Sequence, residues 1–152
     1  MHLIYFRLMI QRIQSLYLLL AALVSGGLIF ILYLWTNQSG NDIYAINSIG
    51  EDNLLLKSTG ILFILSSVLS FISIFLFKNR KTQIVINRLN IVLNFFLLGI
   101  IVYLLLTLSG EAVVSKKGIG SFLPLIVILF LVLANKAIIK DEKLVKSVDR
   151  LR

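Results

Sequence analysis

The sequence predicts an all-α membrane protein, a four-transmembrane-helix bundle with a C-terminal juxtamembrane amphipathic helix. The 152 residues are 59% hydrophobic, above the share of about half found in soluble domains. The apolar residues gather in four stretches, each close to the ~20 residues with which a helix spans a bilayer. Backbone groups in lipid need internal partners, so these stretches are expected to be helical. We expect one domain over residues 1–152, with helices at about 14–35, 58–77, 84–108 and 119–139 and a cytoplasmic tail at 140–152.

The first predicted helix carries aromatic residues toward both ends. Tyr17 lies near one end, and Tyr33 and Trp35 lie near the other. This is the spacing of rings that rest at two membrane–water interfaces. Between them, Ala22-x-x-x-Gly26 forms a smooth surface that permits the close approach of a neighbouring helix.

The residues before this helix allow two further interpretations. Arg7 and Arg12 precede an apolar run, as in a secretory signal peptide. That run is too long for a signal peptide, and no A-x-A-like cleavage site closes it, so we favour a membrane span. Translation can begin at Met1 or, equally well, at Met9.

The connection between the first two helices is polar and acidic. Within it, the apolar runs Ile43 to Ile46 and Leu54 to Leu56 flank the turn-forming stretch Asn47 to Asn53. Two short apolar runs on either side of turn residues are typical of a β-hairpin. We therefore expect a small hairpin across residues 43–56.

The second and third helices carry matching polar rows. The serines follow the i, i+4, i+7 spacing of one helix face, and asparagines, extended back by Gln83, follow i, i+3, i+7. Counted from the short turn between these helices at 1.5 Å per residue, the rows pair at depths of about 5, 10 and 15 Å. The predicted interhelix polar network consists of Ser66, Ser70, Ser73, Asn87, Asn90 and Asn94.

Two explanations of these rows remain open. Unpaired amides in hydrocarbon cost several kcal/mol, so the rows can hydrogen-bond to each other and fix the bundle. Alternatively, they can line a small polar cavity that binds a ligand or a lipid headgroup. We favour packing, because no charged residue accompanies the rows.

The fourth helix leads into a charged tail. Pro124 falls near its start, where a missing N–H group is harmless. Beyond Asn135, two features indicate an amphipathic helix: a Glu142 to Lys146 pair at i, i+4, and an apolar stripe of Ile138, Val145, Val148 and Leu151. We expect this helix to lie on the membrane surface.

Lysine and arginine counts predict the orientation. Of the fifteen, all but Lys57, Lys116 and Lys117 fall in the N-terminus, the second connection with its flank, or the tail. The positive-inside rule therefore places both termini in the cytoplasm, and it explains the net charge of +8 without nucleic acid. The expected contacts with anionic lipids, or with a membrane or cytoplasmic partner protein, are Lys78, Arg80, Lys81, Arg88, Lys140, Lys143, Lys146 and Arg150.

Few residues could carry catalysis. The chain contains no cysteine and one histidine, His2, so we expect no catalytic residue, metal site or cofactor. The predicted spans contain no acidic residue, whereas the small multidrug transporters depend on a membrane-embedded glutamate. Arg88 lies close enough to the inner headgroups to extend its charge to them. We therefore expect no enzyme and no proton-coupled exporter.

Several stretches resemble one family. They are Met9-Ile-Gln-Arg-Ile-Gln14, Phe75-Leu-Phe-Lys-Asn-Arg-Lys81 with Arg88-Leu-Asn90, Gly120-Ser-Phe-Leu-Pro124, and Lys140-Asp-Glu-Lys-Leu-Val-Lys-Ser-Val-Asp-Arg-Leu-Arg152. The chain from Met9 onward is similar to an uncharacterised four-helix integral membrane family of Bacteroidetes, a domain of unknown function. Residues 1–8 depart from it. The resemblance implies a Gram-negative inner membrane and no known activity.

Two functions are consistent with these features. The first is a non-enzymatic scaffold or accessory subunit that presents its basic tail and the turn at Lys78 to Lys81 to a partner or lipid. The alternative is a small transporter or a lipid- or ligand-binding protein that uses the polar faces of the second and third helices. Direct packing of those faces would favour the first.

Overall fold

The protein is an all-α, four-helix, multi-pass membrane protein. The computed structural model describes residues 2–37, 39–108 and 118–151, with side chains described for residues 13–37, 39–107 and 118–151. All four long helices are long and apolar enough to cross a membrane. They are α1 (His2–Gly26), α2 (Leu54–Phe75), α3 (Arg80–Leu108) and α4 (Leu123–Arg150).

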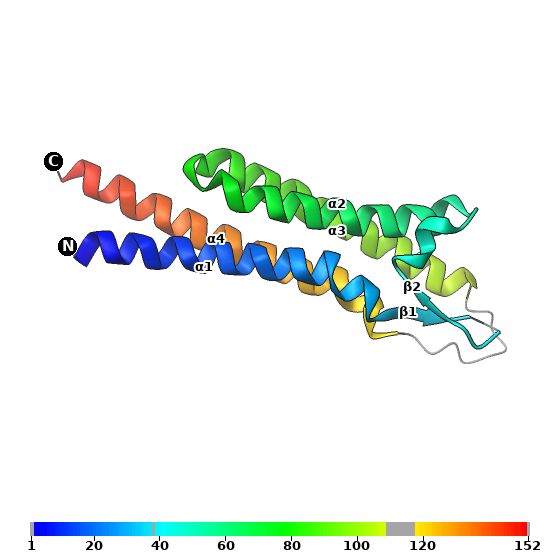
Figure 1. Cartoon of the computed structure of the whole chain (residues 1–152). Helices are drawn as coiled ribbons and strands as arrows, with labels where there is room; N and C mark the ends of the chain where they lie inside the picture. The colour runs from blue at the N-terminus through cyan, green and yellow to red at the C-terminus, as the bar shows by residue number, and fades with distance from the viewer. Residues whose placement is uncertain (1, 38, 109–117, 152) are drawn as a thin grey trace.

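The helices form two antiparallel pairs that pack against each other. Helix α1 contacts α2 and α4, and α3 contacts α2 and α4. Figure 1 shows both termini at one end of the bundle, which is also the end of the short turn between α2 and α3. The ends of α1 and α4 extend past that turn (Figure 1).

Apolar side chains occupy both the inside and the outside of the bundle. Leu18, Phe63, Leu97 and Leu131 are fully buried between the helices. Large side chains on the outer face of α3 are exposed, among them Val92 at 65%. So much exposed apolar surface fits lipid as the surrounding solvent.

Helix α1 ends at Gly26, nine residues before the predicted end at residue 35. Two adjacent glycines lower helix stability here, and the chain passes through a short 3₁₀ turn, η1 (Leu28–Phe30), into strand β1 (Tyr33–Thr36). Trp35 is only 2% exposed and belongs to the core. Its ring therefore packs inside the protein and does not face lipid, and its depth in the membrane stays a prediction.

The predicted hairpin exists at a different place in the sequence. Strand β1 pairs antiparallel with β2 (Asp42–Tyr44), with Tyr33 opposite Tyr44, and Gly40 in the turn has a φ of 81°. The run Leu54 to Leu56 instead opens α2, because the Asn53 side chain caps that helix by accepting a hydrogen bond from the Leu55 N–H at 3.0 Å. A second short 3₁₀ turn, η2 (Asn47–Gly50), follows β2.

The tail is the continuation of α4 and not a separate juxtamembrane helix. Pro124 lies in the first turn, as predicted, and no glycine or proline follows it to break the helix before Arg150. Of the predicted stripe, Ile138 is fully buried in the bundle, whereas Val148 is 37% exposed. The tail therefore projects from the bundle along α4 (Figure 1). A further 3₁₀ turn, η4 (Ile119–Phe122), precedes α4, and η3 (Leu76–Lys78) follows α2.

Candidate functional site

The serine face of α2 and the asparagine face of α3 meet directly. Ser73 Oγ donates to Asn87 Oδ1 at 2.6 Å. Asn90 Nδ2 donates to Ser70 Oγ at 2.9 Å, and Asn94 Nδ2 donates to Ser66 Oγ at 2.7 Å. All six side chains are completely buried. The structure thus forms three serine–asparagine pairs between α2 and α3, in the order that their depths predicted. Each of these hydrogen-bonded pairs is called a rung below.

The polar row continues beyond the predicted residues toward the termini. Gln83 Nε2 donates to the Ser73 carbonyl at 2.9 Å. Asn87 Nδ2 donates to Asn135 Oδ1 at 2.9 Å, which joins α3 to α4. Sequence reasoning missed Asn135, although it is the one amide side chain in α4. Its position in a long apolar stretch was the signal that could have identified it.

Two amide oxygens at the ends of this row have no hydrogen-bond partner among the described residues. They are Gln83 Oε1 and Asn94 Oδ1. Asn94 turns its amide nitrogen toward Ser66 and also toward the carbonyl of Asn90, at 2.8 Å. The donors are thus used within the bundle, which is the arrangement expected of groups that hold helices together.

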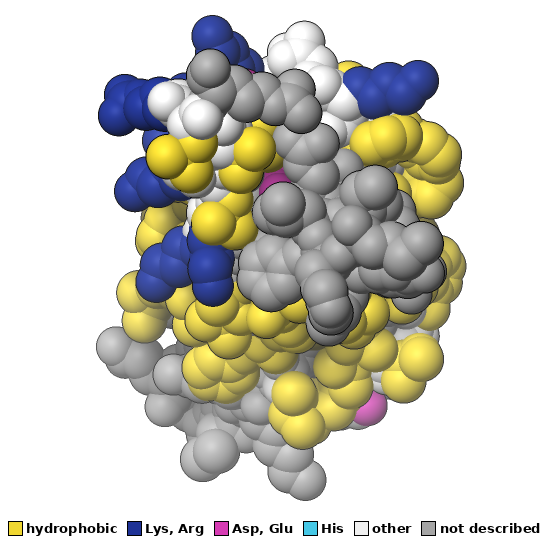
Figure 2. All heavy atoms as spheres, turned by 90° about the vertical axis from the view of Figure 1, so that its left-hand side faces the viewer, with side chains coloured by type: hydrophobic (Ala, Val, Ile, Leu, Met, Phe, Trp, Pro, Cys, Tyr) yellow, Lys and Arg dark blue, Asp and Glu magenta, His cyan; other side chains and the backbone are white. Residues whose placement is uncertain are grey.

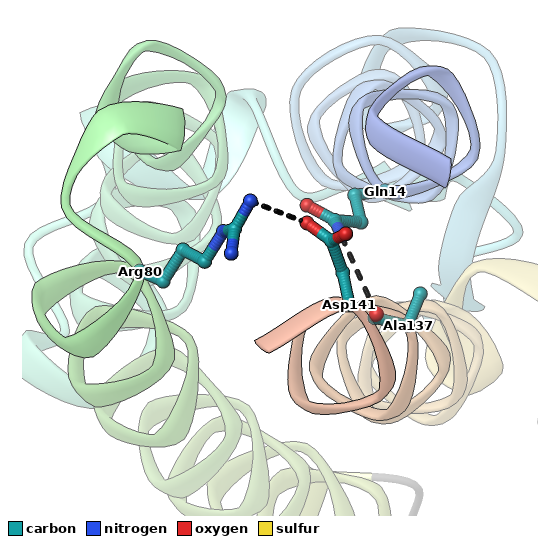
Figure 3. A network of polar contacts seen from close by, with 4 residues as sticks. All are labelled: Gln14, Arg80, Ala137 and Asp141. Carbon is teal, nitrogen blue, oxygen red and sulfur yellow. Dashed lines mark hydrogen bonds and ion pairs between the residues drawn. The ribbon is translucent and has the colours of Figure 1, made fainter. Parts of the chain in front are cut away.

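A second polar cluster links α4 to α3 and to α1 at the end that holds the termini. Arg80 Nη2 at the start of α3 lies 2.7 Å from Asp141 Oδ2 of α4, as an ion pair rather than a well-aligned hydrogen bond. Gln14 Nε2 of α1 donates to the Ala137 carbonyl of α4 at 3.3 Å. Figure 3 shows Arg80 reaching across from α3 toward Asp141, with Gln14 beside it.

Asp141 is a buried acid that the sequence analysis did not single out. Only 1% of its side chain is exposed, against 20% for Arg80. It follows Ala134 and Ile138 along the buried face of α4. Extending the spacing of these two buried residues by one helical turn would have identified Asp141 as a buried position. The prediction that Arg80 is free for lipid or partner was incomplete, because Asp141 engages its guanidinium.

The other predicted basic contacts lie on the surface. Figure 2 looks onto the end with the termini and shows lysine and arginine side chains along its edges, beside exposed apolar ones. Lys146 is 69% exposed and lies 2.9 Å from Glu142 Oε1, so the predicted i, i+4 pair is confirmed. The remaining predicted contacts are all exposed: Lys78, Lys81, Arg88, Lys140, Lys143 and Arg150.

Glu142 stays ionised in this surrounding. The hydrogen bond from Lys146 and the charge of Lys146 lower the pKa of this carboxyl below its usual value, and Lys81 and Arg80 add to the effect. Within the part of the chain that the structure describes, no group of three or more histidine, cysteine, aspartate or glutamate side chains gathers as a metal site. Apart from the Arg80–Asp141 pair, the buried polar side chains that converge between the helices are amides and hydroxyls.

A comparison with protein families matches residues 10–151 to DUF4293, a domain of unknown function. The chain belongs to the DUF4293 family. The curated proteins and the solved structures contain no match to the chain. The DUF4293 match includes the whole polar row and the Arg80–Asp141 pair. That the chain comes from Bacteroidetes stays a prediction.

Proposed function

We propose that this DUF4293 protein is a non-enzymatic scaffold or accessory subunit of the bacterial inner membrane, with both termini in the cytoplasm. The proposed orientation follows the positive-inside rule, since most of the exposed lysines and arginines gather at the end with the termini. In this orientation the last turns of α4 project into the cytoplasm.

One observation carries the proposal: the end of α4 combines exposed charge with exposed apolar surface. Lys143 and Arg150 are exposed, and Leu144 is 39% exposed on the same helix. A helix that presents both kinds of side chain beyond the bundle offers a docking surface for an acidic, partly apolar partner. The polar rows of α2 and α3 support the same conclusion, because their direct hydrogen bonds leave them packed against each other.

The alternative, a small transporter that uses these rows, requires the two faces to separate. Asn90 donates to both Ser70 Oγ and the Ser66 carbonyl, at 2.9 and 3.0 Å. Opening a passage would break these bonds inside hydrocarbon, where the freed groups have no other partners. The packed arrangement therefore favours the scaffold.

The experiment is purification of the full chain in mild detergent, with mass spectrometry of the proteins that accompany it. The test variant replaces Lys143, Lys146 and Arg150 with glutamine. The matched control removes three charges from the other connections by replacing Lys57, Lys116 and Lys117 with glutamine.

We expect one protein to accompany the wild type and the control in near-stoichiometric amount and to be lost from the tail variant. If nothing that co-purifies depends on the tail charges, the scaffold proposal is wrong.

A further inference from the structure

A pocket of about 510 Å³ opens between the α2–α3 turn and the last turns of α4. Its lining residues are Phe77, Lys78, Asn79, Arg80, Lys81 and Glu142. The pocket thus joins a basic turn to the base of the tail. None of these residues belongs to the polar row, and the partner-capture test above changes none of them.

The charges around this pocket do not cancel. Arg80 is paired with Asp141, and Glu142 is paired with Lys146 at 2.9 Å. Lys78 and Lys81 have no ion-pair partner among the described residues, and both are exposed. Two uncompensated positive charges therefore lie at the pocket wall.

The backbone adds to the attraction for an anion. Helix α3 begins at Arg80, so its first N–H groups have no acceptor within the helix. Asn79 Oδ1 accepts from the Thr82 N–H at 3.4 Å, which leaves the earlier N–H groups of this turn for another acceptor. The positive end of the helix dipole favours a negative group at the same place.

The pocket also has an apolar side. Phe77 is 45% exposed at its wall, and Phe75 is 64% exposed at the end of α2, where the membrane span ends. A ligand that fits both sides carries a negative head and an apolar body. Basic pockets between transmembrane helices on the cytoplasmic side bind lipid headgroups in this way.

We propose that this pocket binds the phosphate group of an anionic membrane lipid. Lys78 and Lys81 supply the uncompensated charge, the first turn of α3 supplies N–H donors, and Phe77 contacts the acyl chain. The proposal rests on the cytoplasmic orientation proposed above, because the anionic headgroups it needs are those of the inner leaflet.

The test measures lipid binding to the purified full chain by native mass spectrometry, with dioleoylphosphatidylglycerol as the probe and dioleoylphosphatidylcholine as the neutral comparison. We expect one phosphatidylglycerol to bind more tightly than phosphatidylcholine. Each basic residue contributes about fivefold, so replacing both Lys78 and Lys81 with glutamine should weaken binding roughly twenty-five-fold. Replacing Lys140 and Lys143, which lie outside the pocket, should leave it close to wild type.

A variant that is expected to bind phosphatidylglycerol more tightly separates a loss of the site from a loss of folding, because a misfolded protein would not gain affinity. Glu142→Gln removes the one acidic group at the pocket wall and should tighten phosphatidylglycerol binding. Equal weakening by the two lysine pairs, or no effect of Glu142→Gln, would indicate diffuse attraction and overturn the site.

Soluble glycerol phosphate distinguishes the two sources of phosphate. We expect it to compete poorly, because it lacks the apolar body that contacts Phe77; competition as strong as that of the lipid would overturn the lipid assignment. The partner-capture experiment probes the tail and not this pocket, so either proposal can fail while the other holds.

Discussion

At the residue scale, the bundle depends on amide and hydroxyl groups that satisfy one another inside hydrocarbon. Sequence counting could pair Ser70 with Asn90 because the short turn between α2 and α3 fixes their relative depth. It could not find Asn135 or Asp141 as partners. Those contacts depend on how α4 is rotated about its axis, which no short connection to α3 determines.

Asn90→Leu tests the contribution of one rung. Leucine is similar in size, so the variant removes the two hydrogen bonds to α2 without leaving a large cavity. Membrane hydrogen bonds average about 0.6 kcal/mol and reach about 1.7, so we expect a loss of about 1 to 2 kcal/mol. Unfolding by SDS in mixed micelles measures this loss.

The lipid-facing change Val92→Leu is the control, since Val92 is 65% exposed and makes no rung. We expect its unfolding curve to match the wild type. An Asn90→Leu curve that matched it too would show that the rungs add nothing to stability.

Asp141→Asn tests the buried ion pair. Loss of one partner of a fully buried pair costs about 3–5 kcal/mol, but Arg80 is 20% exposed and water screens its charge, so we expect about 2 kcal/mol. The double variant Arg80→Gln/Asp141→Asn should recover part of that loss, because it leaves no charge unpaired. Strictly additive losses in the same SDS titration would argue against a direct pair.

At the element scale, composition predicted which segments are helices. It placed the end of the first helix at residue 35, whereas α1 ends at Gly26. The residues from Leu28 to Trp35 are as apolar as a span, and hydropathy does not distinguish a buried strand from a helix. Gly26 is predicted from the sequence to lie in a packing surface. In the structure it is also the point where α1 ends.

Gly26 allows α1 to lie close to α2. A Cβ atom added there would fall on the Ser67 side chain, whose hydroxyl donates to the Ala22 carbonyl at 3.0 Å. Gly26→Ala should therefore separate the helices and lower stability by about 1–3 kcal/mol. Gly99→Ala is the matched control, because a Cβ atom at Gly99 meets nothing within 4 Å.

We expect thermal unfolding in detergent to show a lower midpoint for Gly26→Ala and an unchanged or raised midpoint for Gly99→Ala, since alanine favours helix over glycine. Equal midpoints for the two variants would mean that α1 and α2 are not in close contact.

The end of α4 should respond to acid through Glu142. Its pKa is lowered in the folded protein, so the pair with Lys146 stabilises the helix at neutral pH and is lost as the pH falls through the lowered value. A spin label at Ser147→Cys should become more mobile between pH 7 and about pH 3.

The same label in a Glu142→Gln background should already be mobile at neutral pH and should change less on acidification. An identical acid response in both backgrounds would assign the effect to other groups.

At the scale of the whole molecule, two features coincide at one end. Except for Lys57 near the start of α2, the described exposed basic residues lie with the termini and the projecting end of α4, whereas the β1–β2 hairpin lies at the opposite end (Figures 1 and 2). The proposed scaffold and the proposed lipid site both require the first end to face the cytoplasm. Orientation is therefore the claim on which the rest depends.

Cysteine accessibility tests the orientation most directly, because the chain has no cysteine of its own. Single cysteines at Asn41, Ser115 and Asn79 can be treated with an impermeant thiol reagent, first in cells whose outer membrane alone is permeable and then after the inner membrane is opened. We predict that Asn41→Cys and Ser115→Cys react in the first case and Asn79→Cys only in the second. Labelling of Asn79→Cys before the inner membrane is opened, with the other two protected, would contradict the account.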